Sequence, residues 1–346
     1  MNKKNSLLTQ IIVWGVVAFL LLSAFTVLLS RSASGFSGLS ANSWDSLRTI
    51  QEESFPLESV NELEFDFSSM DITVYPTKEE DLTVKLLANR DLRPEELFVS
   101  SAENGKVLVK SRPHRSFFWM FSFGAFKRLE IHLPERYAES LNIETSSGNI
   151  TLPETLALHS LALHLSSGNL SAGDIHTEEF ALGLTSGNIR LDALNSARYE
   201  MRITSGDTEV GAVRGTGSIG SSSGNIRVGS VSGGAQDIST ASGNIRLDGF
   251  TGHGEISTQS GNIRAEEALL TGDLDVRVTS GSASIALAKE AEANIEASVT
   301  SGDIDSDIPL SYDKQGRHAT GQVGENPANT LFVRTTSGDV RISRAE

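Results

Sequence analysis

Apolar and polar residues alternate along most of this chain, on both sides of a recurring Ser-Gly-Asn or Ser-Gly-Asp marker. Apolar side chains stand five residues before the marker glycine, as at Ile143 and Leu163, and two residues after it, as at Ile150 and Leu170. A period of two is typical of β-strands that bury one face. Each marker therefore predicts a strand, a tight turn and a second strand.

The marker occurs nine times and once more as Ser-Gly-Ser at Gly281, and the ten glycines are 18 to 21 residues apart except for a last spacing of 36 residues. We interpret the last spacing as two units, one of which has lost its marker, and the segment SYDKQGRHATGQVGENPANT as a loop insertion before a final unit that closes at Glu346. Glycine adopts positive φ without steric cost, and an Asn or Asp beside it bonds local backbone groups. The residues expected to form structural turns are Gly148, Asn149, Gly168, Asn169, Gly187, Asn188, Gly206, Asp207, Gly224, Asn225, Gly243, Asn244, Gly261 and Asn262.

Only one corner of each unit carries this sharp turn, and the unit length is nearly constant. A series of antiparallel hairpins would need comparable turns at both ends of every strand pair. The pattern instead predicts an all-β fold, a parallel β-solenoid of about ten to thirteen coils with about 19 residues each. Asparagines at equivalent places in successive coils are expected to stack as a ladder.

A degenerate copy of the unit precedes the regular ones. In LEFDFSSMDITVYP, Met70 takes the place of the glycine and Asp71 that of the Asn or Asp. The 78 residues between Met70 and Gly148 equal roughly four units, with larger side chains and irregular connections. We predict a capping region over residues 57–140, continuous with a regular solenoid over residues 141–346.

The first residues predict where the protein is located. Residues 11–29 include 16 apolar residues among 19, enough for a helix of about 28 Å, close to the thickness of a hydrocarbon core. Lys3 and Lys4 precede this segment, which favours a cytoplasmic N-terminus over residues 1–10. We expect a transmembrane helix acting as signal anchor over residues 11–30 and a Ser- and Gly-rich linker over residues 31–56. A cleaved signal peptide is the alternative.

A membrane anchor followed by repeated Ser-Gly-Asn-Ile and Ser-Gly-Asp-Ile strands resembles the bacterial "putative adhesin" β-strand-repeat family, which includes LiaG-like envelope proteins. The resemblance covers roughly residues 57–346. It implies an extracytoplasmic solenoid held at the bacterial cell membrane, often encoded near envelope-stress systems. It implies no activity, because a fold does not define a function.

Composition narrows the function further. The chain has 44 acidic and 29 basic side chains and a net charge of −15, which argues against nucleic acid as a partner. It has no cysteine, so it has neither disulfides nor a thiolate site. Its histidines and carboxylates show no metal-ligand spacing and no catalytic constellation. We therefore predict a protein that is not an enzyme and binds no cofactor and no metal.

An outward-facing position three residues after the marker glycine is a candidate polyanion surface. It carries Arg190, Arg227, Arg246 and Arg264. In consecutive coils such side chains would stand about 4.8 Å apart, a spacing that could hold a cell-wall polymer or an anionic glycan. The favoured alternative is a solvated edge neutralised by neighbours such as Asp248 and Glu266.

A second candidate is the aromatic segment RPHRSFFWMFSFGAFKR, which has basic residues on both flanks. Its candidate membrane- or partner-binding residues are Phe117, Phe118, Trp119 and Phe121. Such a loop could enter the outer leaflet or dock on a membrane partner. The favoured alternative is a core strand of the cap, whose rings pack under the first coil.

Together these features predict a membrane-anchored cell-envelope solenoid that presents a rigid, non-catalytic surface for binding or adhesion. The expected partners are the membrane and a cell-wall polymer, a glycan or another envelope protein. An alternative function is that of an accessory or regulatory component of an envelope-stress membrane system. A polysaccharide-acting β-helix enzyme is less favoured, because the constellation of carboxylates that such an enzyme needs is missing.

Overall fold

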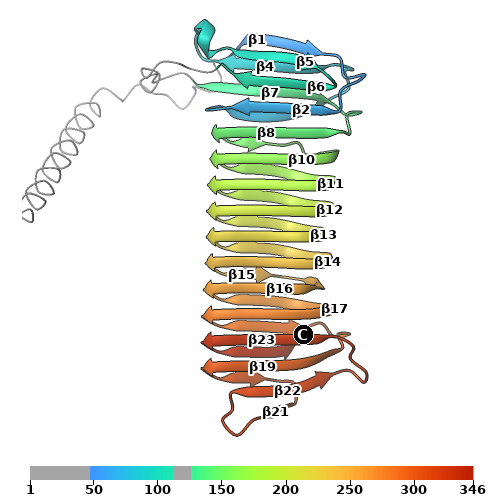
Figure 1. The fold of residues 1–346 in the computed structure, drawn as a ribbon, viewed down its shortest axis with the longest axis vertical. Coiled ribbons are helices and arrows are strands. Elements are labelled where there is room, and N and C mark those ends of the chain that lie inside the picture. Colours follow the sequence, from blue (N-terminus) through green and yellow to red (C-terminus); the bar gives the residue numbers. More distant parts are fainter. Residues whose placement is uncertain (1–46, 113–125, 346) are drawn as a thin grey trace, which may run out of the picture. The chain divides into compact units, whose positions relative to one another are not determined.

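The computed structural model describes residues 47–112 and 126–345. Residues from Thr49 onward form one compact unit, and their buried side chains make a single core that extends from Phe55 to Ile342. Figure 1 shows the strands of this unit stacked along one axis. A fragment that begins at Leu47 therefore contains this whole core.

The predicted cytoplasmic N-terminus and transmembrane helix, residues 1–10 and 11–30, lie outside the described residues. Among the residues that the structure does describe, no helix has the length and apolarity to cross a bilayer. The predicted linker over residues 31–56 ends earlier than expected, because Arg48–Phe55 form strand β1. This strand pairs with β4, so a tertiary contact orders residues whose own sequence pattern is too short to indicate a strand.

The repeated units form the predicted parallel solenoid. Each strand pairs in parallel with the strand one repeat later, in a register that sets Leu170 beside Ile189 and Leu182 beside Met201. The strands of the repeat are β8 (Ser140–Ser147), β9 (Ile150–Thr151), β10 (Thr155–Ser167), β11 (Leu170–Ser186), β12 (Ile189–Ser205), β13 (Thr208–Ser223), β14 (Ile226–Ser242), β15 (Ile245–Leu247), β16 (Phe250–Ser260), β17 (Ile263–Ser280) and β18 (Ala283–Leu287). The marker turns line up along one edge, as the constant unit length predicts.

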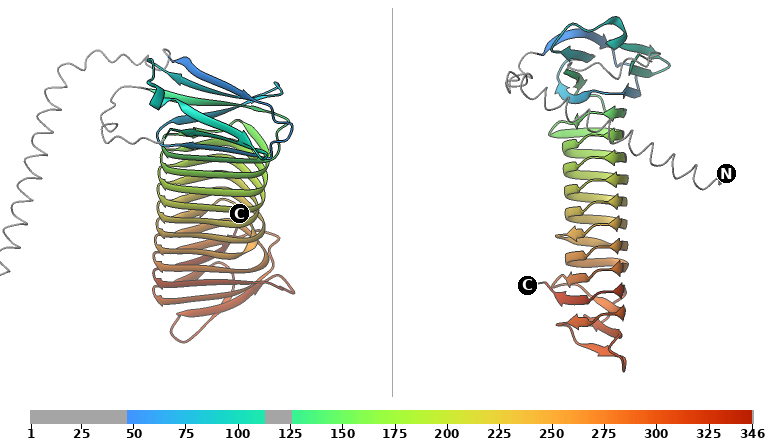
Figure 2. Two further views of the ribbon diagram at one scale, coloured as in Figure 1. Left: turned by 45° about the horizontal axis from the view of Figure 1, so that its top comes forward. Right: turned by 90° about the vertical axis from the view of Figure 1, so that its left-hand side faces the viewer.

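Alternation decides which side chains fill the interior. Leu163 and Met201 are fully buried, whereas the neighbouring His164 and Arg202 face the solvent. Figure 2 shows the windings tilted and edge-on, as a narrow stack. In a stack this thin, side chains from both strand layers meet in the middle, so the alternating apolar positions are enough to build the core.

The N-terminal part of the unit is a cap built on one degenerate coil. Its elements are β1, β2 (Glu62–Phe67), β3 (Asp71–Thr77), β4 (Leu82–Ala88), the short 3-10 helix η2 (Pro94–Glu96), β5 (Phe98–Glu103), β6 (Lys106–Ser111) and β7 (Lys127–Pro134). Strands β2 and β3 pair in parallel with β8 and β9, so Met70 lies at the corner next to Gly148.

The 78 residues between Met70 and Gly148 do not stack as four units, which corrects the expectation from their length. Strands β6 and β7 lie on the outer side of β2 and β3, again in parallel. Beyond them, β5 pairs antiparallel with β6, and β4 pairs antiparallel with β7. These antiparallel strands cover a parallel edge that would otherwise be open to another chain.

At the C-terminal end of the solenoid, the coils do not stack in the order in which they follow along the chain. Its strands are β19 (Ala293–Ser301), β20 (Ile304–Ser306), β21 (Leu310–Tyr312), β22 (His318–Val323), β23 (Thr330–Ser337) and β24 (Val340–Arg344). The last coil of the chain lies between the two that precede it, because β23 pairs in parallel with both β17 and β19 (Figure 1).

The final spacing of 36 residues is therefore not two units with one lost marker. Between Gly302 and Gly338 the chain forms the antiparallel hairpin of β21 and β22, and β22 also pairs antiparallel with β19. The hairpin covers the outer edge of β19. Its residues lack the alternating apolar positions of a coil, and one side of it remains in the solvent.

Candidate functional site

The marker corners form one continuous hydrogen-bonded ladder. The side-chain oxygen of Asn169 accepts a bond from the backbone N–H of Asn188 at 2.9 Å, and the same contact repeats from coil to coil. In spatial order the ladder runs through Asp71, Asn149, Asn169, Asn188, Asp207, Asn225, Asn244, Asn262, Ser282, Asp339 and Asp303. The ladder thus joins the degenerate cap coil to the far end.

This geometry assigns the asparagines a structural role. The amide of Asn244 accepts from Asn262 and also donates to Asn225, at 3.0 Å. Its oxygen and one of its N–H groups are therefore already bonded inside the ladder. The marker glycines lie directly against each other, since a Cβ on Gly168 would meet the carbonyl oxygen of Gly148. The corner is a structural turn, as its residue types predict.

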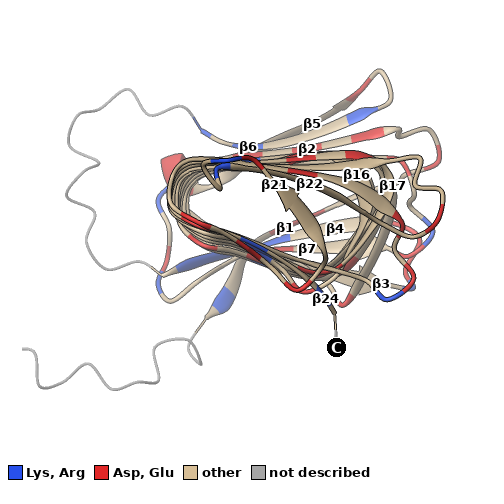
Figure 3. Ribbon diagram, turned by 90° about the horizontal axis from the view of Figure 1, so that it is seen from below, with Lys and Arg blue, Asp and Glu red and all other residues tan. Residues whose placement is uncertain are grey.

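The predicted arginine column exists, but its charges are neutralised. Arg227, Arg246 and Arg264 are in register on consecutive coils. Arg190 stands apart from them, because Glu209 occupies the rung between Arg190 and Arg227. The column is therefore one of mixed charge, and Figure 3 shows residues of both signs of charge along the windings.

Two carboxylates hold the three consecutive arginines. Asp248 lies 2.6 Å from Arg246 and 3.3 Å from Arg227, while Glu266 lies 2.5 Å from Arg264 and 4.0 Å from Arg246. The hydrogen bond that Arg246 donates to Asp248 raises the pKa of Arg246. A polyanion would have to compete with these carboxylates, so the geometry supports a solvated, ion-paired edge.

Another column, which the sequence analysis did not single out, is made of serines. The residue before each marker glycine is in register from coil to coil and faces the solvent. Its members are Ser147, Ser167, Ser186, Ser205, Ser223, Ser242, Ser260, Ser280, Ser337 and Ser301. The repeated Ser-Gly pair in the sequence already indicated this column of hydroxyl groups. Only the strand register shows that the hydroxyl groups form one continuous surface from coil to coil.

The predicted aromatic residues Phe117, Phe118, Trp119 and Phe121 lie outside the described residues. The structure does describe both flanks of their segment. In the strand register, Lys110 of β6 lies opposite Asp66 of β2, and Arg128 of β7 lies opposite Asp71 of β3, on either side of the corner at Met70. Strands β6 and β7 therefore correspond to the two strands that flank a Ser-Gly-Asn corner in a regular coil.

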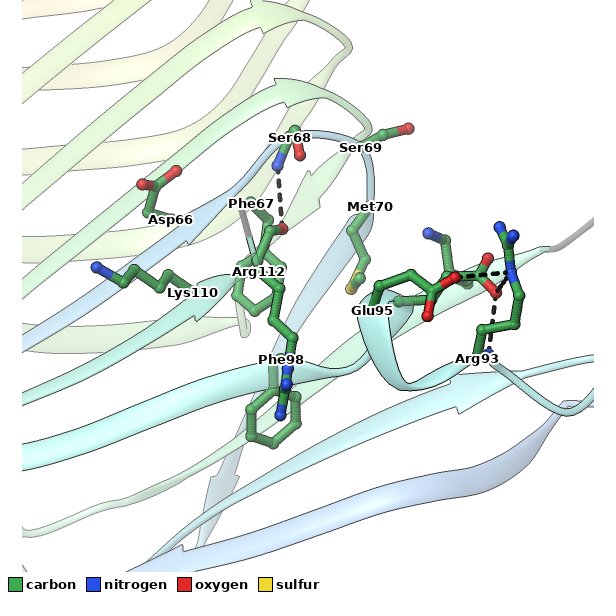
Figure 4. A pocket seen from close by; sticks show the side chains of 13 residues that line it. Asp66, Phe67, Ser68, Ser69, Met70, Arg93, Glu95, Phe98, Lys110 and Arg112 are labelled. Carbon is green, nitrogen blue, oxygen red and sulfur yellow. Dashed lines mark hydrogen bonds and ion pairs between the residues drawn. The ribbon is translucent and has the colours of Figure 1, made fainter. Parts of the chain in front are cut away.

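A cavity of about 470 Å³ opens at this corner (Figure 4). Phe67, Met70 and Phe98 supply apolar lining, and the β2–β3 turn supplies hydroxyls. The charged side chains that line it are Asp66, Arg93, Glu95, Glu96, Lys110, Arg112 and Lys127. The two flanks of the aromatic segment, Arg112 and Lys127, thus meet at one cavity.

The carboxylate of Glu96 is buried and hydrogen-bonded within the cap. Its side chain is only 5% exposed, and it accepts bonds from Arg90 at 2.9 Å and from Arg93 at 3.2 Å. Burial by itself raises the pKa of Glu96, but the hydrogen bonds from Arg90 and Arg93 outweigh this effect and lower the pKa to about 2. Burial lowers the pKa of Lys127, and the negative charge of Glu96 partly opposes this shift.

The described residues offer no arrangement for metal-dependent chemistry. Within residues 47–112 and 126–345, no group of three or more histidine or carboxylate side chains could hold a metal ion. Burial raises the pKa of Tyr137 and of Tyr199, and both phenols are bonded internally, to Ser140 and Gln236. These two shifted groups therefore serve packing.

A search of solved structures finds several bacterial proteins to which this chain is similar. A "putative adhesin" from Bacteroides fragilis is 13% identical, with 86% of this chain and 96% of that chain covered and a TM-score of 0.31. A "putative adhesin" from Parabacteroides distasonis is 13% identical, with the same coverage and a TM-score of 0.38. A "putative lipid binding protein" from the same species is 13% identical, again with the same coverage and a TM-score of 0.36.

No curated protein matches this chain. The model of one protein family does match it, under the description Toastrack DUF4097, first over residues 60–232 and again over residues 216–343. These two overlapping matches cover the cap from β2 onward and nearly every coil, and they confirm the adhesin-like repeat resemblance that the Ser-Gly-Asn strands indicate. The chain therefore belongs to the Toastrack DUF4097 family.

Proposed function

We propose that the protein is a membrane-anchored, extracytoplasmic binding module of the bacterial cell envelope, without catalytic activity. The observation that carries this proposal is the in-register repetition of identical exposed side chains along one edge of the solenoid. Parallel strands place neighbouring members of a column about 4.8 Å apart. Such a surface offers the same contact at every coil.

A periodic surface favours a periodic ligand. One hydrogen bond to an exposed serine contributes only about 1 kcal/mol, too little to hold a small molecule. A polymer that engages several coils gains from every added contact, because each later contact forms within the same complex. The serine column suits a chain rich in hydroxyl groups.

The ion pairs favour a glycan over a polyanion as the ligand. Arg246 and Arg264 are already bound to Asp248 and Glu266, and the whole chain is strongly acidic, with a net charge of −15. A polyanion would be repelled by this overall charge and would have to displace the carboxylates. We therefore favour a glycan or a cell-wall polymer of low charge as the ligand.

The test is a pull-down of the fragment 47–346 against fractionated cell envelope and purified wall glycans. We expect the glycan fraction to be retained. A triple variant of column serines, S186A/S205A/S223A, should weaken retention at least tenfold, and a matched variant of exposed serines off the column, S171A/S230A/S311A, should not. Equal retention by both variants would contradict the serine edge as the binding surface.

A second variant tests the arginine column by itself. Replacing Arg227, Arg246 and Arg264 with serine removes the three consecutive guanidinium groups. If binding of an anionic wall polymer falls while binding of neutral glycan stays constant, the ligand is a polyanion and our preference is wrong. We expect both kinds of binding to be unchanged. The membrane location is tested separately, by fractionating cells that express the full chain with and without residues 11–30.

A further inference from the structure

A second cavity opens where the cap coil meets the first regular coil. Its volume is about 680 Å³, and it shares no lining residue with the cavity at the Met70 corner. This volume is within the range of small-molecule pockets, about 300–1,000 Å³. Its lining comes from β3, from the end of β7 and the chain that follows it, and from residues 151–157, and the structure describes every one of these residues.

Two prolines explain why the stack opens at this place. Strand β3 is in register with β9 only at Ile72 and Thr73, and beyond these residues its register continues only with β7. Strand β9 has just 2 residues, and Pro153 lies shortly after its end. Neither Pro153 nor Pro76 of β3 has a backbone N–H, so neither can donate a hydrogen bond that would hold the two coils together. The coils separate beyond Thr73, and the cavity lies in the gap.

The walls of this cavity are apolar. Val74, Leu133 and Leu152, which line it, are part of the core and are exposed by 5% or less. The ring of Tyr75 also lines it and is 37% exposed. This ring is stacked on that of His132, with 5.4 Å between the two centroids, so it is supported on one face. An exposed aromatic ring beside buried aliphatic side chains offers a contact surface to an apolar ligand.

The charged side chains of the lining are all acidic. Glu135 and Glu154 are exposed, and no ion pair joins either carboxylate to another residue in the described ranges. None of the lining residues, all of which the structure describes, is basic. Arg136 follows Glu135 in the chain but donates to the backbone oxygen of Glu80 at 2.9 Å and does not line the cavity. The site therefore combines apolar walls with negative charge that the protein leaves unpaired.

From this arrangement we propose that the cavity binds an amphiphilic organic cation, a molecule with an apolar body and a positively charged amine. The apolar body would displace water from the aliphatic walls. The ammonium group would form charge-assisted hydrogen bonds with Glu135 and Glu154, and the ring of Tyr75 offers a cation–π contact. An anionic amphiphile would be repelled by the same carboxylates and by the net charge of −15.

Calorimetric titration of the fragment 47–346 tests the charge of the ligand. The three probes share an octyl chain and are used below their critical micelle concentrations: octylammonium, octanol and octyl sulfate. We expect octylammonium to bind at least tenfold more tightly than octanol, and octyl sulfate to bind more weakly than both. E135Q/E154Q should weaken octylammonium binding at least tenfold and leave octanol binding unchanged. The matched control E103Q/E144Q removes two exposed, unpaired carboxylates outside the cavity and should bind like the parent.

A second pair of variants tests the cavity itself without a change of charge. Ala157 is exposed and lines the cavity, so the indole of A157W would occupy the space and should reduce the binding of octylammonium and octanol at least tenfold. A102W is the control, because Ala102 is an exposed alanine of β5 that lies outside the cavity. Thermal unfolding midpoints of the two variants should agree, so that lost binding cannot be attributed to lost folding.

Four results would each overturn the proposal. They are the absence of octylammonium binding, equal binding by A157W and A102W, octanol binding as tight as that of octylammonium, and unchanged octylammonium binding by E135Q/E154Q. Tight octanol binding would identify an uncharged apolar ligand instead. Sedimentation of the parent as a dimer that A157W dissociates would identify a second copy of the chain as the occupant and would also overturn it. No serine of the column lines this cavity, so these outcomes do not bear on the serine edge.

Discussion

A Cβ atom on Gly187 would lie 1.8 Å from the carbonyl oxygen of Gly168 in the neighbouring coil. The backbone of Gly187 also has a φ of 140°, which side-chain-bearing residues rarely adopt. Both constraints come from stacking, and both recur at the marker glycines of the other coils. The corner is therefore the place where the sequence has the least freedom to vary.

Replacing Gly187 with alanine tests this constraint. We expect a loss of about 3 kcal/mol in the free energy of unfolding, because the strained backbone and the contact with Gly168 must both be relieved. The measurement is urea unfolding of the fragment 47–346. G220A is the matched control, since a Cβ there finds its nearest neighbour at 3.8 Å, and it should lose less than about 1 kcal/mol. Equal losses of unfolding free energy in the two variants would show that the corner glycine is no more constrained than Gly220.

The asparagine ladder predicts that two substitutions of Asn244 lower the stability of the fold by different amounts. N244A removes the acceptor for the backbone N–H of Asn262 at 3.0 Å and the donor to Asn225. We expect a loss of about 1 kcal/mol, because water can reach this exposed edge and replaces part of the bonding. N244D keeps the acceptor, as Asp207 does for Asn225 at 2.8 Å, and should lose less. Thermal unfolding midpoints that fall in the opposite order would contradict the ladder.

Acid should selectively weaken the cap. The folded-state pKa of Glu96, about 2, lies below the ordinary value of 4.5, so its contribution to stability is present above pH 4.5 and is lost as the pH falls toward 2. The variant E96Q should be less stable than the parent at neutral pH, and the difference should disappear in strong acid. The measurement is urea unfolding at a series of pH values, with E95Q as an exposed control that should show little such trend.

The position of the last coil can be tested with introduced cysteines, because the chain has none of its own. Arg334 lies between Arg277 and Ser298 in one column. The two outer residues are therefore two strand spacings apart, about 9.6 Å, which is too far for a disulfide. R277C/S298C should not cross-link in the full chain, whereas R277C/R334C should.

Removing residues 328–346 should reverse this result. The register that pairs Leu274 with Leu331 and Leu331 with Ile295 allows β19 to dock directly on β17 once the last coil is gone. R277C/S298C would then be one strand spacing apart and should form a disulfide under mild oxidation, seen by non-reducing electrophoresis. A truncated chain that stays uncross-linked and unfolded would show that the inserted coil is required for this end of the solenoid.

Much of the fold can be predicted because its rules are local. The period of two places Ile143 and Leu163 inside, and the Ser-Gly-Asn corner aligns Asn169 on Asn149. The same local rules do not predict the order in which the coils stack at the two ends of the solenoid. Every coil has the same apolar positions, so the pattern alone does not say that β23 inserts between β17 and β19 or that β2 lies between β6 and β8.

The candidate sites likewise include features that the sequence predicts and features that it does not. The serine and arginine columns follow directly from unit length, since residues at equivalent places must stack. The ion pairs of the arginine column cannot be predicted from the unit length, because Asp248 pairs with Arg246 on its own coil and with Arg227 on the neighbouring coil. The cavity at Met70 is not visible in the sequence at all, because its lining comes from β2, η2, β5, β6 and β7, which are distant along the chain.

The sequence by itself determines the strand period, the glycine corners and the stacking of like residues on like, because these depend on neighbours within one repeat. Only the tertiary structure decides which coil lies beside which and how the edges are covered. Those outcomes depend on long connections and antiparallel caps, whose energies arise from contacts between segments that no repeat pattern relates.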